Sequence, residues 1–126
     1  MTLYVLDTTL FIDYARGMPA AIQIFRQLAE SANELYVCDV IVCEALSGGN
    51  DDERAMIEKL LEPIEYVATH PDAARWAAES RRRAGKTSRR NIADAMIAGF
   101  AWFSNATVVT RNPDDFVAQG IPVLTY

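Results

Sequence analysis

The chain of 126 residues has one histidine, two cysteines and no apolar run of the ~20 residues needed to cross a membrane. Cys38 and Cys43 lie across a predicted strand–helix junction and form no disulfide framework, so we expect small buried hydrophobic residues in a reducing compartment. His70, directly before Pro71, gives no zinc motif and is expected to be structural. The first residues lack the features of a signal peptide. We therefore expect a cytoplasmic protein with no membrane contact.

Basic residues are scarce over most of the chain, which carries a net charge of −5. Half of its twelve basic residues lie in RRRAGKTSRR, residues 81–90: Arg81, Arg82, Arg83, Lys86, Arg89 and Arg90. The overall acidity argues against a general nucleic-acid-binding protein, but a concentrated basic run can contact phosphate groups. The alternative interpretation of this run is a solvated helix face followed by a loop.

Linkers, low-complexity segments and internal repeats are also absent, so we expect one domain over residues 1–126. Short apolar runs predict strands at residues 3–6, 35–38, 64–68, 107–110 and 122–125. Helical spacing and capping residues predict helices at 8–14, 20–32, 40–46, 51–62 and 71–84, and one from Thr87 or Ser88. This alternation predicts an α/β fold whose parallel sheet is covered on both faces.

Acidic side chains follow several of these predicted strands. Asp7 follows the first strand, Asp39 the second, and the segment TRNPDDF (110–116) the fourth. In parallel sheets, ligand sites lie at the carboxyl ends of the strands, so these segments are expected to share one edge. Glu44 in VIVCEAL and Asp94 in NIADAMIAGFAWF lie inside apolar helices. Burying an unpaired carboxylate costs several kcal/mol, so Asp94 needs either a partner or a metal.

Each of these acids also has a simpler interpretation. Asp7 and Asp39 can cap helices, although the threonines after Asp7 are equally suited to cap the first one. Glu44 can face solvent on its helix. Asp94 can pair with Arg90, four residues earlier on the same helix side.

Asp115, in VVTRNPDDF, can simply occupy the first turn of a short helix opened by Pro113. Taken together, however, several carboxylates around one strand edge repel one another unless a cation holds them. Ligation by oxygen alone suits Mg²⁺ or Mn²⁺. Such ions activate water and neutralise charge on a phosphate group, which is what cleavage of a phosphodiester requires.

The order LDTT, VIVCEAL, NIADAMIAGFA and TRNPDDF resembles the PIN-domain ribonucleases, and most of all the small VapC-type toxins of toxin–antitoxin pairs. The resemblance implies a three-layer α/β/α sandwich with a parallel sheet of four or five strands. Asp7, Glu44 and Asp94 match the three core acids of the family, as metal ligands and catalytic residues. Many relatives have a fourth acid where this chain has Asn112, and Asp115 is then the candidate for that charge.

The resemblance also implies roles for residues around these acids. Candidate hydroxyl groups that orient the carboxylates or bound waters come from Thr8, Thr9 and Thr110, and Asn112 can supply a neutral oxygen. Since the basic run leads into the Asp94 helix, we expect it to hold the RNA backbone through Arg82, Lys86, Arg89 and Arg90.

The implied function is that of an Mg²⁺- or Mn²⁺-dependent endoribonuclease, the toxin of a type II toxin–antitoxin system, which hydrolyses RNA with a metal-activated water. A transfer RNA or a ribosomal RNA loop is the expected substrate. The expected partners are a cognate antitoxin protein and a second copy of the chain. Candidate contact residues for either partner are Ile12, Tyr14, Phe25 and Trp102, which otherwise belong to the core.

Three alternatives come from other classes. A response-regulator receiver domain has a similar length and acidic pocket, but it needs a lysine late in the chain, and the last one here is Lys86. A PIN fold that has lost catalysis and acts only as an interaction module is kept open by Asn112. Structure-specific DNA nucleases with related sites are usually much longer than this chain.

Overall fold

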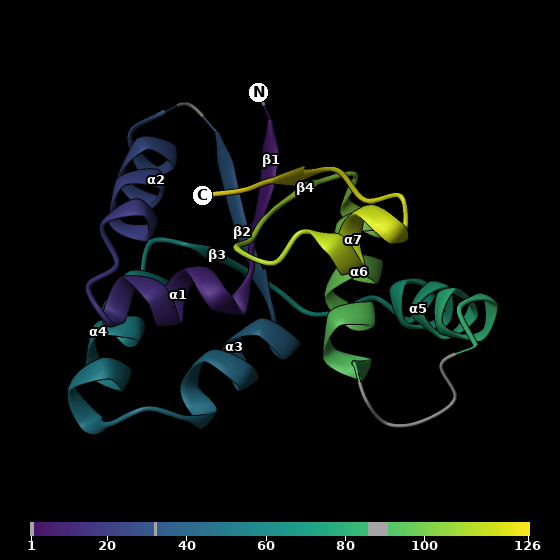
Figure 1. The fold of residues 1–126 in the computed structure, drawn as a ribbon, viewed down its shortest axis with the longest axis horizontal. Coiled ribbons are helices and arrows are strands. Elements are labelled where there is room, and N and C mark those ends of the chain that lie inside the picture. Colours follow the sequence, from purple (N-terminus) through teal and green to yellow (C-terminus); the bar gives the residue numbers. More distant parts are fainter. Residues whose placement is uncertain (1, 32, 86–90) are drawn as a thin grey trace.

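The computed structural model describes residues 2–31, 33–85 and 91–126, and within them five strands form one parallel sheet (Figure 1). The strands are β1 (Leu3–Leu6), β2 (Glu34–Cys38), β3 (Glu65–Val67), β4 (Thr107–Val109) and β5 (Val123–Leu124). Their order is β3-β2-β1-β4-β5, with β1 at the centre. Tyr4 of β1 pairs with Leu35 on one side and with Thr107 on the other. All five strands lie where the sequence predicts them, within one or two residues at each end.

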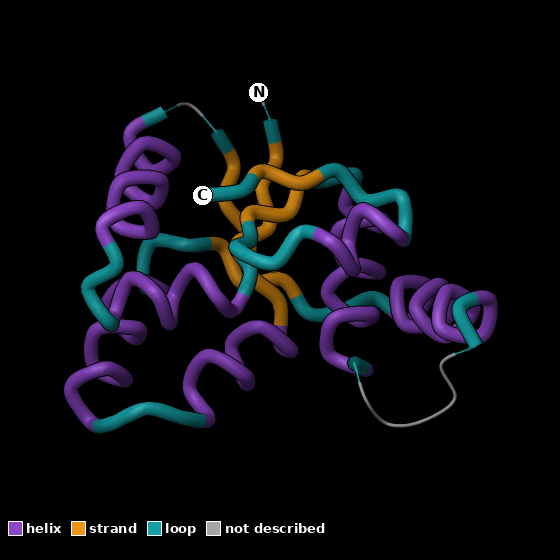
Figure 2. Tube along the Cα trace, viewed as in Figure 1, coloured by secondary structure: helices purple, strands orange, loops and turns teal. Residues whose placement is uncertain are grey.

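Helices lie on both sides of this sheet, as the tube representation shows (Figure 2). They are α1 (Thr8–Ala15), α2 (Pro19–Glu30), α3 (Asp39–Ser47), α4 (Asp51–Leu61), α5 (Pro71–Arg83), α6 (Ile92–Ser104) and α7 (Asp114–Ala118). In Figure 1, α1, α2 and α4 lie to the left of the strands, and α5, α6 and α7 lie to the right. The predicted α/β/α sandwich is therefore confirmed. None of the helices in the described residues is both long and apolar enough to cross a membrane.

Helix starts follow the capping chemistry only in part. Asn50 caps α4 through a reciprocal capping box with Glu53, directly before the helix predicted at residues 51–62. The cap of α1, in contrast, is Asp7 and not one of the threonines, because the Asp7 carboxylate accepts from the backbone N–H of Thr8. The prediction that Asp39 caps α3 is also wrong. Cys38 has an extended backbone and occupies the N-cap position, so Asp39 is the first residue of the helix.

The helix that carries Asp94 starts later than predicted. It begins at Ile92, because Asn91 before it has a left-handed backbone with φ of 61°. The predicted start at Thr87 or Ser88 is therefore wrong for α6, and both residues lie outside the described part of the chain.

The histidine has a structural role, and the two cysteines are not bonded to each other. His70 caps α5 by accepting from the N–H of Asp72, and its ring stacks on Phe103 with centroids 4.3 Å apart. This is the structural role predicted for it. Both cysteines are free thiols, but Cys43 is exposed, so the expectation of two buried cysteines is correct only for Cys38.

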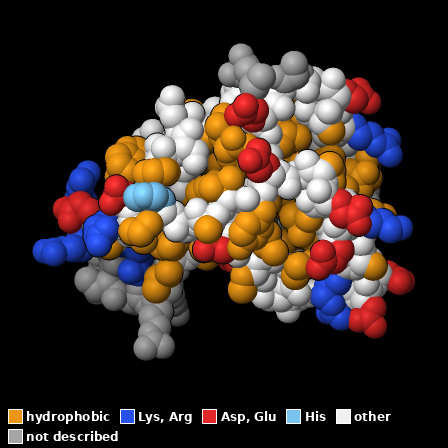
Figure 3. All heavy atoms as spheres, turned by 180° about the vertical axis from the view of Figure 1, so that it is seen from behind, with side chains coloured by type: hydrophobic (Ala, Val, Ile, Leu, Met, Phe, Trp, Pro, Cys, Tyr) orange, Lys and Arg blue, Asp and Glu red, His pale blue; other side chains and the backbone are white. Residues whose placement is uncertain are grey.

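Close packing of α5 against α6 sets one wall of the molecule. Gly99 of α6 faces α5, and a Cβ there would clash with the carbonyl oxygen of Ala73. Near this contact, Trp76 stacks on Trp102 with ring centroids 5.6 Å apart. Trp102 is 48% exposed, and the rear view shows hydrophobic side chains gathered around His70 (Figure 3). Phe25, in contrast, is a core residue, so it is not left over for a partner.

Candidate active site

A pocket of about 590 Å³ lies at the carboxyl ends of β1 and β4. We call it the acid pocket, because the four predicted acids line it: Asp7, Glu44, Asp94 and Asp115. They come from the end of β1, from α3, and from the first turns of α6 and α7. The predicted neighbours Thr8, Thr9 and Asn112 also line it. The structure thus brings together residues that are up to 108 positions apart in the sequence.

Asp7 is firmly held and only 5% exposed. Its Oδ1 accepts from the backbone N–H of Thr8 at 2.8 Å. Its Oδ2 accepts from the hydroxyl of Thr110 at 2.8 Å and from that of Thr9 at 3.4 Å. The backbone N–H of Asp7 also donates to the carbonyl of Val109, at 3.0 Å. These contacts fix the carboxylate before any ligand arrives.

The surroundings of Asp7 raise its pKa above the ordinary value. Burial is the largest cause, and the negative charge of Glu44 adds to it. Hydrogen bonds from Thr110, Thr8 and Thr9 act in the opposite direction but do not cancel the effect of burial. A nearby cation would therefore stabilise the ionised form of this carboxylate.

Glu44 is coupled to Asp7 through a single residue. Its Oε1 accepts from the Thr8 hydroxyl at 2.9 Å, while the Thr8 N–H donates to Asp7. Unlike Asp7, Glu44 is exposed at the mouth of the pocket. Asp94 is half-buried in the first turn of α6. Arg90, its predicted pairing partner, lies outside the described residues.

Two residues of the β4–α7 segment are candidates for the predicted fourth acidic position. Asp115 lines the pocket from the first turn of α7, as the helix opened by Pro113 predicts. Asn112 lines it too, and its backbone N–H donates to the Thr110 hydroxyl oxygen at 3.0 Å. Both therefore line the same pocket as Asp7, Glu44 and Asp94.

Two findings argue against a metal site that is already formed in the free protein. Asp39 does not line the acid pocket; its carboxylate accepts from the N–H of Val40 and from the hydroxyl of Thr69. Within the described ranges, no three His, Cys, Asp or Glu side chains form a group that is arranged to hold a metal ion. The donors in the pocket are nevertheless carboxylate oxygens, which is the chemistry that Mg²⁺ and Mn²⁺ prefer.

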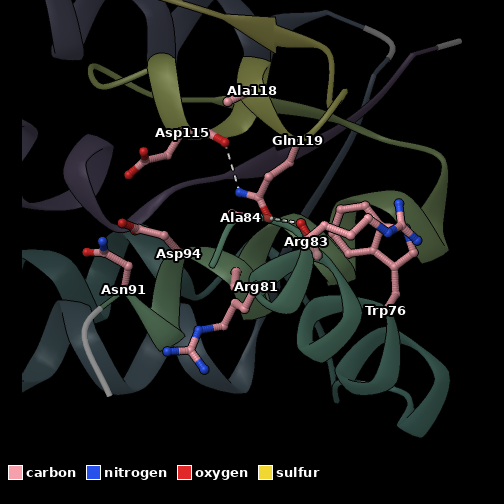
Figure 4. A pocket seen from close by; sticks show the side chains of 11 residues that line it. Trp76, Arg81, Arg83, Ala84, Asn91, Asp94, Asp115, Ala118 and Gln119 are labelled. Atoms are coloured by element: carbon pink, nitrogen blue, oxygen red, sulfur yellow. Dashed lines mark hydrogen bonds between the residues drawn. The ribbon is translucent and has the colours of Figure 1, made fainter. Parts of the chain in front are cut away.

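A second pocket of about 290 Å³ adjoins the acid pocket and shares Asp94 and Asp115 with it (Figure 4). Gln119 donates from Nε2 to the carbonyl oxygen of Asp115 at 2.8 Å and accepts from the Ser80 hydroxyl at 2.9 Å. This chain of hydrogen bonds joins α7 to α5. The second pocket therefore runs from the acids to the basic end of α5.

The basic run contributes to this second pocket through Arg81 and Arg83. Arg82, a predicted RNA-binding residue, lines neither of these two pockets. The other three predicted RNA-binding residues, Lys86, Arg89 and Arg90, lie outside the described part of the chain.

Sequence reasoning missed three residues that the fold brings to the acid pocket or directly behind it. Arg111 lines the pocket, Asp13 is buried in α1, and Tyr126 follows β5. One signal was available for Asp13: it lies three residues after Leu10, on the buried face of its helix. The position of Tyr126 depends on how β5 pairs with β4, which the sequence does not show.

Comparison with known proteins agrees with this architecture. The PIN domain model matches residues 4–120. Ribonuclease VapC11 from Mycobacterium tuberculosis is 34% identical over 122 residues, which cover 90% of each chain. VapBC2 from Rickettsia felis, solved bound to a DNA fragment from its promoter, superimposes with a TM-score of 0.81 at 18% identity and 98% coverage of both chains.

The DNA-bound VapBC from Salmonella typhimurium has a TM-score of 0.78 at 23% identity, covering 99% of this chain and 98% of that one. These distant structures establish the fold. The match to the PIN domain family model and the similarity to VapC11 establish that the chain is related to this family in sequence. The protein described here is thus a member of the PIN domain family.

Proposed function

We propose that the protein is a metal-dependent endoribonuclease that acts as the toxin of a type II toxin–antitoxin pair. The observation that carries this proposal is the convergence of Asp7, Glu44, Asp94 and Asp115 on one pocket at the carboxyl edge of the sheet. The names of its relatives support it, since VapC11 is a ribonuclease and the structural neighbours are VapBC proteins. We further propose that residues 1–126 form one PIN-like domain.

The donor set of the acid pocket fits Mg²⁺ or Mn²⁺. Asp7 and Asp94 would hold the ion directly, and Glu44, which is exposed and linked to Asp7 through Thr8, would hold it directly or through water. Asp115 is our candidate for the fourth acid. A bound ion supplies positive charge that acidifies water and stabilises a phosphate under attack.

The protein's own groups prepare the pocket for this chemistry. Thr110 and Thr8 keep both oxygens of Asp7 in fixed directions, and Thr8 also directs the Glu44 carboxylate. Thr9 adds a longer contact to Asp7. Preorganised carboxylates lose little conformational freedom when a ligand binds, so these hydroxyls should strengthen both affinity and rate.

We propose that RNA approaches along the basic run, with Arg82, Lys86, Arg89 and Arg90 holding its backbone. The second pocket supports this path, because it connects the acids with the basic end of α5. A transfer RNA or ribosomal RNA loop is the proposed substrate, since loops expose single-stranded bases to sequence-specific proteins. Because such RNA is cytoplasmic, we propose the same location for the protein.

The proposed partners are a cognate antitoxin and a second copy of the chain. An antitoxin would inhibit most directly by placing a cationic side chain among the carboxylates of the acid pocket, because Arg pairs well with such groups. The half-exposed Trp102 is the contact residue that we propose for either partner.

A second candidate is an interaction module that keeps the PIN fold without catalysis. Asn112 favours it, because a neutral side chain lines the pocket where many relatives have an acid. So does the lack, within the described residues, of a preformed group of three metal ligands. Binding of metal without cleavage of any RNA would be its signature.

The test is to incubate the purified protein with total cellular RNA and Mg²⁺ or Mn²⁺, and to analyse the ends of any fragments. Hydrolysis by activated water predicts a 5′-phosphate and a 3′-hydroxyl at each cut. Ends carrying a 2′,3′-cyclic phosphate would contradict this mechanism. A complete absence of fragments, with metal still raising the melting temperature, would favour the non-catalytic module.

A further inference from the structure

Arg111 is held at the acid pocket by a buried carboxylate. Its Nε donates to Oδ2 of Asp13 at 2.7 Å, and Asp13 is only 4% exposed. The same Oδ2 accepts from the Tyr126 hydroxyl at 2.8 Å. The backbone N–H of Arg111 donates to the Thr9 hydroxyl oxygen at 3.3 Å. Two contacts with α1 hold Arg111 directly, and a third, from Tyr126 after β5, holds the Asp13 carboxylate that binds it.

The outer end of this arginine is available to a ligand. Its side chain is 45% exposed, and among the described residues only Nε of the guanidinium has a hydrogen-bond partner. The two Nη groups can therefore donate to an anion. The hydrogen bond and charge of Asp13 raise the pKa of Arg111, so the guanidinium remains charged.

The charge of Arg111 contrasts with the rest of the pocket. Of the described residues that line it, five are Asp or Glu and Arg111 is the single cation. A polyanion that enters such a pocket meets repulsion from every carboxylate that lacks a counter-charge. An arginine with a fixed orientation at this place offsets the repulsion at one defined phosphate position.

On the basis of the proposed function, we propose that Arg111 binds a phosphate group of the RNA beside the scissile one, and that Asp13 and Tyr126 are positioning residues which orient its guanidinium. Arginine suits this role because its planar group can bond a phosphate with both Nη atoms while Nε is engaged elsewhere. A guanidinium oriented in advance loses less conformational entropy on binding.

The simpler interpretation is that Arg111 only neutralises the buried Asp13. A buried carboxylate does need such a partner, and breaking the pair is costly. Neutralisation alone, however, requires neither the exposed outer half of the arginine nor its place among the acids. The Tyr126 hydroxyl also supplies Asp13 with a second donor, which further restricts the orientation of the carboxylate.

The experiment measures binding of fluorescein-labelled bulk transfer RNA by anisotropy, in Mg²⁺ and at several KCl concentrations. All proteins carry Asp94→Asn so that the RNA stays intact. We expect Arg111→Gln to raise Kd roughly ten-fold, because losing one hydrogen bond to a charged group weakens binding by about this factor. The slope of log affinity against log salt should fall by about 0.7, as for one phosphate contact of a single strand.

Matched variants separate binding from folding. Arg26→Gln makes the same charge change at an exposed site on α2, away from the acid pocket, and should leave Kd and slope almost unchanged. Arg111→Lys keeps a charge beside Asp13 but loses the planar fork, so it should keep the slope and lose part of the affinity. It replaces Arg111→Gln as the decisive variant if the glutamine protein does not fold.

Tyr126→Phe tests the positioning role. It should raise Kd about three-fold without changing the slope, because the arginine keeps its charge but loses part of its orientation. In the Arg111→Gln protein it should have no further effect on RNA binding, whereas a purely structural tyrosine would add its own loss.

The outcomes distinguish the two levels of the proposal. If the Asp94→Asn protein binds no RNA and the unmutated protein cleaves none, the proposed function fails and this inference fails with it. If the unmutated protein cleaves RNA but the Asp94→Asn protein binds none, the inference alone is overturned. If it binds RNA but Arg111→Gln, or Arg111→Lys in its place, behaves like Arg26→Gln, the proposed function stands and Arg111 only neutralises Asp13. If Tyr126→Phe weakens RNA binding equally with and without Arg111→Gln, the positioning role of Tyr126 is overturned and the role of Arg111 stands.

Discussion

The hydroxyl of Thr110 donates a hydrogen bond of 2.8 Å to Oδ2 of Asp7, across 103 positions of the sequence. Thr110 is fully buried, and its oxygen also accepts from the N–H of Asn112. One hydroxyl therefore connects Asp7, at the end of the central strand, with Asn112 of the β4–α7 segment. This relationship explains why β1 and β4 must be neighbours for the pocket to exist.

Replacing Thr110 by Val should weaken both the fold and the site. The shape is nearly kept, but Asp7 loses a donor and the Asn112 N–H loses its acceptor, so we expect a loss of about 1–3 kcal/mol in the free energy of unfolding. RNA cleavage should fall roughly 10- to 100-fold, as for other groups that orient metal ligands. Chemical denaturation and a cleavage assay measure the two effects.

Thr107→Val is the matched control, because Thr107 lies on the same strand and its hydroxyl has no hydrogen bond within the described residues. It should change neither quantity appreciably. Equal losses from both variants would mean that the Thr110 hydroxyl has no special role.

Asp7→Asn should stabilise the metal-free protein near pH 7. Burial raises the pKa of Asp7, so the folded protein keeps this proton to a higher pH than the unfolded chain does. The free energy of unfolding therefore falls as pH rises from the unfolded pKa through the raised folded pKa. The asparagine variant escapes this loss, and its oxygen can still accept a hydrogen bond.

Urea denaturation in EDTA at pH 7 and at successively lower pH checks this prediction. The stability gain of Asp7→Asn should be largest at neutral pH. It should disappear below the pKa that Asp7 has in the unfolded chain, because Asp7 is then protonated in both the folded and the unfolded state. Glu58→Gln, at an exposed position of α4, should show no such pattern. A neutral-pH loss for Asp7→Asn would contradict the account of its burial.

Gly99→Ala should destabilise the fold by about 1–3 kcal/mol, the usual cost of overpacking. The added Cβ would clash with the carbonyl oxygen of Ala73 and push α6 away from α5. Gly48→Ala is the control, since Gly48 has an extended backbone and open space around its Cα. Thermal unfolding of both variants measures the difference. If the two melt alike, the close contact of α5 and α6 is not important for stability.

Arg83→Gln should weaken RNA binding if the second pocket forms part of the RNA path. Arg83 lines that pocket and pairs with Glu79 at 3.7 Å on the helix surface. Arg75 has a similar surface pair with Asp72 at 3.5 Å but does not line the pocket. We expect a several-fold rise in Kd and a salt slope reduced by about 0.7 for Arg83→Gln only. Equal behaviour of Arg75→Gln would show that only overall charge matters.

Much of the fold follows from local sequence signals. Alternating apolar runs locate the strands, and Asn50 and Pro71 mark helix starts correctly, because each supplies its own local capping or backbone preference. Two failures occur where neighbouring residues compete for one cap, and a third where the left-handed backbone of Asn91 delays the start of α6. Asp7 displaced the threonines in this role, since its carboxylate reaches the N–H of Thr8.

Asp7, Glu44 and Asp94 were predictable because each is a charge in an apolar segment, whereas Asp115 was predicted only from the resemblance to the family. Their surroundings were not, since the contacts of Asp7 with Thr110 and of Asp13 with Tyr126 span most of the chain. Such pairs depend on the order of the strands in the sheet, which the alternation of strands and helices along the sequence does not specify. Arg111 was overlooked for the same reason: its sequence neighbours do not indicate that it faces the acids.

The most direct test of the central claim is cleavage of total cellular RNA by the metal-stripped protein, with Mg²⁺ or Mn²⁺ added back and Asp94→Asn prepared alongside. We predict discrete fragments only when metal is present, and only for the unmutated protein. Fragments that form in EDTA, or equally with Asp94→Asn, would contradict the claim that the acid pocket holds the catalytic metal.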